Sequence, residues 1–389
     1  MESILGAHAR LLRERGHDVR VIAGRGDAEI VPEVDSRHPE VERLYRALGR
    51  GEVDEAAFAR LTGVLRGRLR PLLADRDVVV AHNVMTMPFN LALAAALAGG
   101  GVPVLAWTHD LAWTNPRYRE YRRPGPVYDV LHTAQPGVTY VAISRLRQAE
   151  IARTLDVPAA RVPVVPNGVD AAAFLGLGAS TRALLDAAGA RGTWPLVLVP
   201  VRITRRKRIE LAIEAAALLR PRHPGLRLVV SGPLGPHNAD NRRYAAELAR
   251  RRDELGLGDV TCFLYGLAGP DGRHPVDDVA IAELYRAADC VVLPSESEGF
   301  GLPALEAALA RAPMVAADIE VMREVAGAGL HYFPADGDAT DVAGAIERAL
   351  ASRPSRLRRR ALSRHDWPAV VDQMESLIED STWRRSPDS

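Results

Sequence analysis

Short β-branched runs alternate along the chain with longer stretches whose apolar residues recur at helical spacing. The first helical stretch, from Ile4 to Leu12, is followed by Gly16, a residue that favours the end of a helix. The β-branched runs are nearly all apolar, as expected of strands covered on both faces. The sequence predicts strands at 19–23, 78–81, 102–107, 138–143, 162–165, 196–201, 226–231, 260–265, 290–293 and 314–316. It predicts intervening helices at 209–219, 242–254, 279–287 and 303–310. This alternation is typical of α/β domains with parallel sheets.

A turn signal divides the pattern into two series. Segment 166–170 has the sequence Pro-Asn-Gly-Val-Asp, and a Gly- and Ala-rich stretch follows it as far as Ser180. Clusters of these residue types between periodic segments mark turns and linkers. We therefore expect a domain boundary near residue 175, with a doubly wound α/β domain on each side. An amphipathic helix around 367–378 then closes the chain.

Composition excludes several classes of protein. A length of 389 residues predicts two or three domains. The 50 Lys and Arg residues balance 49 Asp and Glu residues, so the net charge of +1 gives no basic field for nucleic acid. Cys262 and Cys290 lie in apolar runs, which fits buried thiols in a reducing compartment. The sequence has no apolar run of about 18 residues to span a membrane and no signal peptide at its start. We expect a soluble, cytoplasmic protein.

Arginine supplies nearly all of the positive charge. Only one of the 50 basic residues is a lysine, Lys207. A lysine can persist against such a bias where a compact ammonium is needed and a planar guanidinium does not fit. It can also persist by chance on a solvated surface. Composition leaves both explanations open.

Segment 295–306 has the pattern of an anion-binding turn. An apolar strand leads into a loop with two glycines, the second of them Gly301, and Pro303 favours the first turn of a helix. The free backbone N–H groups and the positive dipole end of a helix attract anions. Glu298 and Glu306 flank this turn, and we expect their carboxylates to bind sugar hydroxyls. The alternative is a tight turn in which Glu306 is simply an exposed helix residue.

Glu298 and Glu306 have the spacing of the E-x7-E motif of retaining glycosyltransferases with the GT-B fold, and the chain resembles glycosyltransferase family 4. Arg202 followed five residues later by Lys207 is a second match. Further matching regions are 166–170, 229–232, 284–295 and the stretch around Trp367. The resemblance implies two doubly wound, Rossmann-like α/β domains that face each other across a cleft. It implies an acceptor-side domain at 1–175, a nucleotide-sugar domain at 176–364, and a helix within 365–389 that packs back on the first.

The resemblance also assigns a donor site. Arg202 and Lys207 are implied to grip the donor diphosphate and, with the helix N-terminus near Gly301, to stabilise it as it leaves, without a metal. The catalytic candidates are His109, Glu298, Arg202 and Lys207. The donor-binding candidates are Arg202, Lys207, Gly232, Glu298, Phe300, Gly301, Leu302 and Glu306. The other arginines of this stretch, Arg205, Arg206 and Arg208, are expected to be solvated.

The acceptor-side candidates follow strands of the first series. His109 lies just past the strand at 102–107, where parallel sheets bind ligands. The resemblance implies that it approaches the transferred sugar; the alternative is a loop histidine that caps Asp110. His82 and Asn83 follow another strand and are, with Asp110, candidates for acceptor contacts.

Other stretches bear on metals and partners. Segment 336–338 has the Asp-Gly-Asp pattern that other glycosyltransferases use for metal, but a Gly-containing turn explains it better. We therefore expect no metal and no cofactor. Segments 116–124 and 353–360 are rich in arginine. Each fits either a solvated surface or contact with an anionic acceptor or phospholipid head groups, which would place the protein peripherally at the inner membrane face.

The sequence therefore predicts a metal-independent, retaining transfer of a hexose from a GDP-mannose or UDP-glucose type donor to a hydroxyl acceptor. The acceptor can be a small molecule, a glycan or a lipid-linked molecule. Family members usually open with a strand and a glycine-rich loop, whereas this sequence begins at the helix itself, so we expect the first strand to be missing. That departure keeps a catalytically impaired sugar-nucleotide-binding protein as an alternative. A phosphorylase-like member of the same fold is the other.

Overall fold

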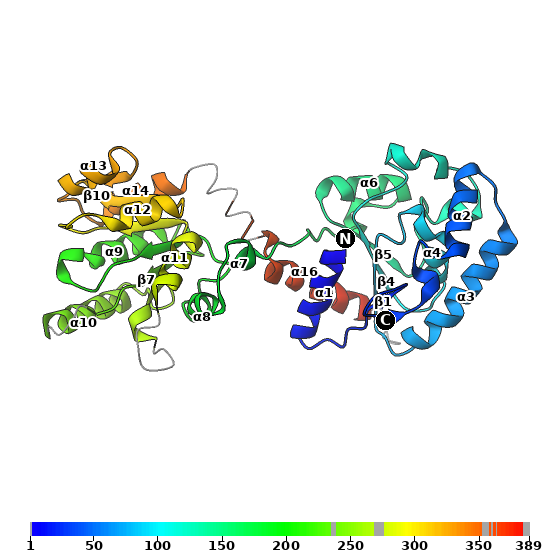
Figure 1. Cartoon of the computed structure of the whole chain (residues 1–389), viewed down its shortest axis with the longest axis horizontal. Coiled ribbons are helices and arrows are strands. Elements are labelled where there is room, and N and C mark those ends of the chain that lie inside the picture. Colours follow the sequence, from blue (N-terminus) through cyan, green and yellow to red (C-terminus); the bar gives the residue numbers. More distant parts are fainter. Residues whose placement is uncertain are drawn as a thin grey trace. The chain divides into compact units, whose positions relative to one another are not determined.

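The computed structural model describes residues 2–234, 239–267, 276–351, 358, 361–362 and 364–383. The chain divides into two compact units (Figure 1). Unit 1 comprises Met1–Gly168 and Pro368–Ser389, and unit 2 comprises Val169–Trp367. The chain thus passes from unit 1 to unit 2 inside the turn segment 166–170. The last described helix, α16 (Trp367–Trp383), belongs to unit 1 from its second residue onward.

In its described part, unit 2 is built on a six-stranded parallel sheet with the strand order β11-β10-β9-β6-β7-β8. Its strands are β6 (Leu196–Val199), β7 (Arg227–Val230), β8 (Thr261–Phe263), β9 (Cys290–Leu293), β10 (Met314–Ala317) and β11 (His331–Phe333). The chain adds β7 and β8 on one side of β6, then β9, β10 and β11 on the other. This is the predicted doubly wound order. The direction of winding reverses between β6 and β9, and such a reversal opens a crevice beyond the carboxyl ends of the two strands.

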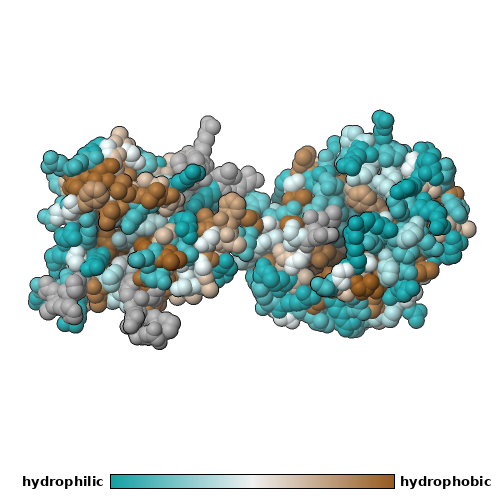
Figure 2. Space-filling view, in the orientation of Figure 1, coloured by the Kyte–Doolittle hydropathy of each residue, from teal (hydrophilic) through white to brown (hydrophobic). Residues whose placement is uncertain are grey.

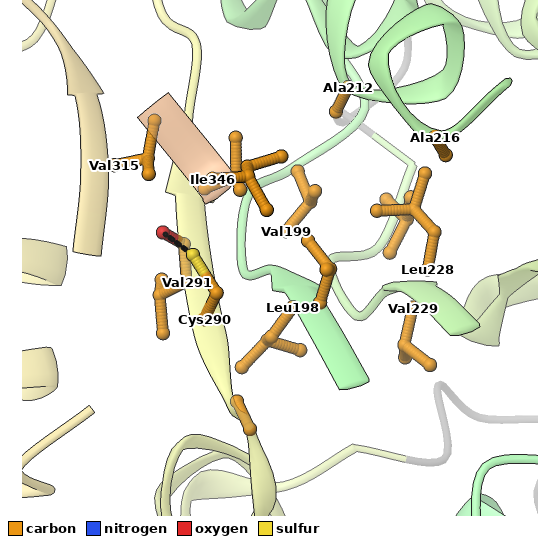
Figure 3. Packing of buried hydrophobic residues seen from close by; sticks show 14 of the residues in the cluster. Leu198, Val199, Ala212, Ala216, Leu228, Val229, Cys290, Val291, Val315 and Ile346 are labelled. Carbon is orange, nitrogen blue, oxygen red and sulfur yellow. Dashed lines mark hydrogen bonds between the residues drawn. The ribbon is translucent and has the colours of Figure 1, made fainter. Parts of the chain in front are cut away.

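Apolar side chains fill the space between this sheet and its helices. The helices of unit 2 are α7 (Ala171–Phe174), α8 (Ala179–Ala187), α9 (Ile209–Leu219), α10 (Ala239–Glu254), α11 (Asp278–Ala287), α12 (Leu302–Leu309), α13 (Glu320–Ala326) and α14 (Ala339–Leu350). Leu198 and Val291 lie on adjacent central strands, and Ala212 of α9 and Ile346 of α14 belong to the same buried cluster (Figure 3). Cys290, fully buried, donates its Sγ–H to the Val291 carbonyl at 3.7 Å. The four residues of β9 are apolar because both faces of the sheet are covered.

Unit 1 carries a smaller parallel sheet in the order β3-β4-β5 and a separate parallel pair, β1-β2. Its strands are β1 (Ile22–Ala23), β2 (Glu29–Ile30), β3 (Val79–His82), β4 (Val104–Thr108) and β5 (Val138–Ala142). Its helices before α16 are α1 (Glu2–Glu14), α2 (Pro39–Arg50), α3 (Glu55–Leu73), α4 (Leu91–Ala98), α5 (Pro126–Asp129) and α6 (Arg145–Leu155). Among the described residues, these strands show no reversal of winding like that of unit 2.

Two predicted strands of unit 1 are shorter than the sequence suggested, for a physical reason. In a longer β1, the Val19 carbonyl would accept a hydrogen bond from a neighbouring strand. Instead it accepts from the Arg13 guanidinium at 2.7 and 3.1 Å. The predicted strand at 162–165 is reduced to one bridge, between Val164 and Ala142. β-branched runs therefore overestimate sheet where side chains satisfy the backbone.

Helix α16 returns to helix α1 within unit 1. Arg15, just past the end of α1, donates from Nη1 to Glu375 at 2.9 Å and from Nη2 to Asp372 at 2.6 Å. His17 Nε2 lies 3.0 Å from the other Glu375 oxygen. The predicted helix within 365–389 is thus observed up to residue 383, and residues 384–389 lie outside the described part. No described helix combines the length and the apolar character needed to cross a membrane.

Candidate active site

The loops that follow β6 and β9 meet at the point where the sheet of unit 2 reverses its winding. The Glu296 N–H donates to the Arg206 carbonyl at 2.9 Å, which ties the two loops together. Beside this bond, Lys207 Nζ forms an ion pair and hydrogen bond with Glu298 Oε1. The side chains of Lys207 and Glu298 are only 9% and 8% exposed. The structure therefore brings together two predicted donor-site residues, which neutralise each other.

Helix α12 begins directly after this loop. Gly301 is its N-cap residue and has φ +87°, a left-handed conformation that side chains rarely adopt. A Cβ atom on Gly301 would also lie 2.9 Å from Met322 Sδ. Pro303 occupies the first turn, and the first residue of the helix is Leu302. Gly301 is thus required by conformation and by space, and α12 begins at the end of the loop that carries Glu298.

Two arginines of the β6 loop form hydrogen bonds with other loops of unit 2. Arg206 was expected to be solvated, and its side chain is 53% exposed. Yet its Nη1 donates to the Ser297 carbonyl at 2.8 Å and lies 3.9 Å from Glu298 Oε2. Arg208, at φ +48°, donates to the Ala335 and Gly337 carbonyls at 2.6 and 2.8 Å. Arg206 is thus solvated as predicted and also contacts the loop after β9, whereas the partly buried Arg208 is held by carbonyls that follow β11.

Arg202 and Gly232 lie where the ends of β6 and β7 approach each other. The exposed Arg202 makes no side-chain hydrogen bond or ion pair with any described residue. A Cβ atom on Gly232 would overlap the Val201 carbonyl and lie 2.6 Å from the Arg202 backbone nitrogen. The neighbouring Ile203 N–H donates to the Pro233 carbonyl at 3.0 Å. Gly232 is therefore required by the close approach of two backbones.

Three buried hydroxyl groups surround the same strand ends. Ser231 follows β7, Ser295 follows β9, and Thr204 lies in the loop after β6. In the described part of the chain, the side-chain oxygen of each is buried and has no hydrogen-bond partner. Ser231 and Ser295 are 2% and 1% exposed. Unsatisfied buried hydroxyls are rare and call for a water, ion or ligand.

Glu306 lies on the exposed side of α12, and one of its oxygens is already held. The buried Tyr285 hydroxyl, from α11, donates to Glu306 Oε2 at 2.7 Å. Burial, and then this hydrogen bond, raise the pKa of Tyr285 well above its usual range, so the hydroxyl remains a donor. The sequence analysis did not single out Tyr285. Its only signal was membership of the 284–295 run.

Phe300 and Leu302, both predicted to bind donor, remain open to solvent. Their exposed fractions are 56% and 58%. Leu305 and Leu309 continue the same apolar row along α12, at spacings that place them on one face of the helix. Figure 2 shows this region of unit 2 as an apolar area. The geometry of unit 2 gives neither Phe300 nor Leu302 a fixed partner.

In unit 1, the predicted His82 and His109 are in contact. His82 Nδ1 lies 3.3 Å from His109 Nε2, and the rings stack with centroids 5.6 Å apart. Asn83 is left-handed, with φ +55°, and its Oδ1 accepts from the backbone N–H groups of His109 and Asp110 at 2.8 and 3.0 Å. Asn83 therefore shapes the turn that presents His109. Asp110 forms an ion pair with Arg147, whose Nη2 lies 3.6 Å from Asp110 Oδ1.

A third histidine, His8 of α1, completes this cluster and was missed by sequence reasoning. Its ring lies 5.1 Å from that of His82 and 4.7 Å from that of Trp107. Burial, and then the neighbouring histidines, lower the pKa of His8 to about 4 and that of His82 to about 3. Burial also lowers the pKa of His109. The cluster is neutral at physiological pH.

The remaining sequence candidates have structural partners. Asp338 is the N-cap residue of α14 and accepts from Thr340 and Asp341 backbone N–H groups, so segment 336–338 is used as a helix start. Within the described ranges, no group of three or more His, Cys, Asp or Glu side chains is placed to hold a metal ion. Residues 353–357, 359 and 360 lie outside those ranges.

The aromatic side chains of the basic segment 116–124 pack inside unit 1. Tyr121 is buried, stacks on Tyr45 at 5.0 Å between ring centroids, and donates its hydroxyl to the Tyr45 carbonyl. Tyr118 packs edge-on against Phe89. The arginines Arg117, Arg119 and Arg122 are exposed. The aromatic residues stabilise unit 1, and the side chains of Arg117, Arg119 and Arg122 reach solvent.

Comparison with known proteins assigns the chain to a family. A family model described as Glycosyltransferase Family 4 matches residues 1–173, and one described as Glycosyl transferases group 1 matches residues 182–366. A D-inositol 3-phosphate glycosyltransferase of Actinosynnema mirum is 32% identical, over 75% of this chain and 68% of that protein. One of Thermomonospora curvata is 30% identical, over 89% and 81%. The chain belongs to glycosyltransferase family 4 and is a transferase enzyme.

Among solved structures, HepE of Anabaena in complex with UDP is 20% identical and covers 82% of each chain, at a TM-score of 0.37. A likeness this low adds no argument to the sheets and site described above. The family expected from the motifs is confirmed. The role of the two glutamates of the E-x7-E spacing stays a prediction.

Proposed function

We propose that the chain transfers a hexose from a nucleoside diphosphate sugar, of the GDP-mannose or UDP-glucose type, to a hydroxyl acceptor with retention of configuration and without a metal. The observation that carries this proposal is the arrangement at the β6–β9 crossover. There a buried lysine is paired with the carboxylate of Glu298, and the loop that carries Glu298 leads three residues later into Gly301, the N-cap residue of α12.

The charges of this site suit a sugar diphosphate. The carboxylate of Glu298 offsets the ammonium of Lys207 within the buried pair. A diphosphate that enters can draw on Lys207, on Arg202, which has no side-chain partner among the described residues, and on the N–H groups of α12, while Glu298 turns to sugar hydroxyls. The buried hydroxyls Ser231 and Ser295 supply further donors. Such preorganised donors stabilise negative charge as it develops on a leaving group.

The proposed reaction needs no enzymatic nucleophile. The bond between the sugar C1 and the diphosphate oxygen breaks, and the diphosphate leaves with the electron pair. The acceptor hydroxyl oxygen bonds to C1 on the face that the diphosphate has left, and its proton passes to a diphosphate oxygen. Arg202 and Lys207 stabilise the leaving diphosphate in this step. His109, held by Asn83, is assigned to the transferred sugar.

The acceptor is proposed from the names of the relatives. Two of them, each about 30% identical, are named D-inositol 3-phosphate glycosyltransferase. A phosphorylated polyol is therefore the first acceptor to test. The exposed arginines of segment 116–124 are consistent with an anionic acceptor.

The experiment is a transfer assay with radiolabelled GDP-mannose and UDP-glucose, with and without D-inositol 3-phosphate, in phosphate-free buffer. The expected result is acceptor-dependent glycoside, and NMR of the product should show the anomeric configuration of the donor. Donor turnover only when inorganic phosphate is added would favour the phosphorylase-like alternative. Nucleotide-sugar binding without turnover on a broad acceptor panel would favour the impaired binding protein. Inverted product would overturn the retaining mechanism.

A further inference from the structure

We infer that Tyr285 is a positioning residue that orients Glu306 and thereby sets how strongly the donor site prefers a ribose with free hydroxyls. This inference rests on the proposed function, to which we add that Glu306, a donor-binding candidate from the sequence, binds the ribose hydroxyls of the donor. Tyr285 lies on a neighbouring helix and contacts the Glu306 carboxylate; we assign it no contact with the donor itself.

The geometry separates the two ends of the interaction. Tyr285 lies in the last turn of α11, and only 2% of its surface is exposed. Its ring is therefore fixed by packing. Glu306 projects from α12 on the solvent side. The hydrogen bond of 2.7 Å between them joins a rigid donor to a carboxylate whose long side chain would otherwise sample several rotamers.

The chemistry of a carboxylate explains why one held oxygen matters. An ionised carboxylate has about four acceptor sites on two oxygens, and it donates no hydrogen bond. The Tyr285 hydroxyl occupies one site on Oε2 and leaves Oε1 with both of its sites. The two adjacent hydroxyls of a ribose can then donate to a carboxylate that is already in place. Burial raises the pKa of Tyr285 well above its usual range, so its hydroxyl remains a hydrogen-bond donor to this carboxylate.

The test compares binding of a nucleoside diphosphate, GDP or UDP, whichever binds more tightly, with binding of its 2′,3′-dideoxy analogue, by calorimetry. The readout is the ratio of the two dissociation constants. This ratio does not change with the fraction of folded protein, so it separates orientation from stability. We expect about a tenfold preference for the ribose form in the parent protein, and a preference near one in Glu306→Ala.

Tyr285→Phe should reduce the preference at least threefold with little change in the affinity for the dideoxy analogue. Combining Tyr285→Phe with Glu306→Ala should add nothing to Glu306→Ala alone, because the tyrosine acts through that carboxylate. The matched control is Tyr128→Phe, which removes another 2% exposed phenol hydroxyl, one that donates to the Leu48 carbonyl at 2.8 Å in unit 1. It should leave the preference unchanged.

The outcomes separate the two claims. A parent-like preference in Glu306→Ala removes Glu306 from the proposed donor site, and this inference with it. A preference lost in Glu306→Ala but kept in Tyr285→Phe overturns the inference about Tyr285 alone. Tyr285→Met serves as a second variant without a hydroxyl. If neither Tyr285 variant folds, the inference is also overturned, because a positioning role requires that the fold survive loss of one hydroxyl.

Discussion

The one lysine of the chain, Lys207, is paired with Glu298, a carboxylate 91 residues further along the sequence. Both side chains are less than one-tenth exposed. The lysine is therefore not an accidental survivor on a solvated surface, which was one of the two explanations that composition left open. A chain that uses arginine almost everywhere keeps a compact ammonium at a buried contact between two loops.

Replacing this lysine by arginine should impair turnover. Lys207→Arg keeps the charge but brings a longer, planar group into a closed space, so its charge cannot lie where that of the ammonium did. We expect kcat/KM to fall about tenfold or more, which corresponds to about 1.4 kcal/mol of transition-state stabilisation. Steady-state kinetics at a temperature well below Tm measure this. An arginine variant as active as the parent would contradict the assignment of Lys207 to the diphosphate.

Removing the lysine side chain should also destabilise the protein. Lys207→Ala leaves Glu298 buried without its partner, and breaking a buried pair in this way typically costs about 3–5 kcal/mol. The double variant Lys207→Met with Glu298→Gln has no unpaired charge and should recover most of the lost Tm, while remaining inactive. Thermal unfolding of the three proteins provides the comparison. Equal Tm losses in the single and double variants would show that the pair contributes through packing alone.

Arg206 should matter for donor affinity although it is half exposed. Arg206→Ala removes the hydrogen bond to the Ser297 carbonyl and loosens the loop that carries Glu298. We expect KM for the donor to rise several-fold, with a smaller change in kcat. Arg205→Ala is the matched control, because Arg205 pairs with Glu247 on the surface and makes no contact with that loop. A rise in KM of the same size in both variants would show that only overall positive charge is involved.

Gly232 should tolerate no side chain. In Gly232→Ala the new methyl group meets the Val201 carbonyl and the backbone nitrogen of Arg202, and neither can rotate away. We expect a loss of about 1–3 kcal/mol in the free energy of unfolding, as in other overpacked sites, together with weaker donor binding. Gly258→Ala is the control, since nothing lies within 4 Å of a Cβ atom there. Denaturant unfolding and calorimetry measure the two effects.

Acid should destabilise unit 1 through its buried histidines. His8 and His82 have pKa values of about 4 and 3 in the folded protein, against an ordinary 6.5. The unfolded chain therefore binds more protons below pH 6.5, and the free energy of unfolding falls as pH falls. The expected slope is about 1.4 kcal/mol per pH unit for each histidine, from pH 6.5 to about 4.

His8→Phe should reduce the slope of the free energy of unfolding against pH by the share of one histidine, about 1.4 kcal/mol per pH unit. Phenylalanine still places an aromatic ring at this position, but that ring does not bind a proton. Urea unfolding at several pH values, followed by circular dichroism, measures the slope. The same variant at pH 8, where the parent histidines are neutral, controls for altered packing. A slope unchanged by His8→Phe would mean that the acid sensitivity arises elsewhere.

Removing divalent metal should leave turnover nearly intact. The proposed site neutralises the diphosphate with Arg202, Lys207 and the N-terminus of α12, so the reaction does not depend on Mg²⁺ or Mn²⁺. Activity in excess EDTA is compared with activity after metal is added back. If EDTA lowers activity more than tenfold and Mg²⁺ or Mn²⁺ restores it, the metal-independent reaction is contradicted.

The sequence predicted best where local pattern and burial agree. The predicted bounds of α9 (Ile209–Leu219) and β9 (Cys290–Leu293) match the structure, because the first is apolar and free of helix breakers, and the second is a short run that must be buried on both faces. The glycine loop before α12 was also recognisable, since Gly301 must be left-handed.

Contacts between distant segments were beyond the reach of the sequence. Neither the Lys207–Glu298 pair nor the Arg206–Ser297 hydrogen bond has a local signature, because each depends on β6 and β9 being neighbours in the sheet. Asn83 shows the same limit in unit 1. Its amide had been proposed for the acceptor, whereas its oxygen accepts from two backbone N–H groups that only the fold brings near.

Unit 1 is assembled from both ends of the described chain, with the whole of unit 2 between them. During translation, the partners of Arg15 in α16 emerge only after unit 2 has been made. At roughly 5–20 residues per second, synthesis of unit 2 takes on the order of ten to forty seconds. Unit 2, which is continuous in sequence, can therefore fold first on the ribosome. During that interval, the part of unit 1 that has already been made lacks α16. The surface that α16 later covers is then exposed to chaperones and proteases.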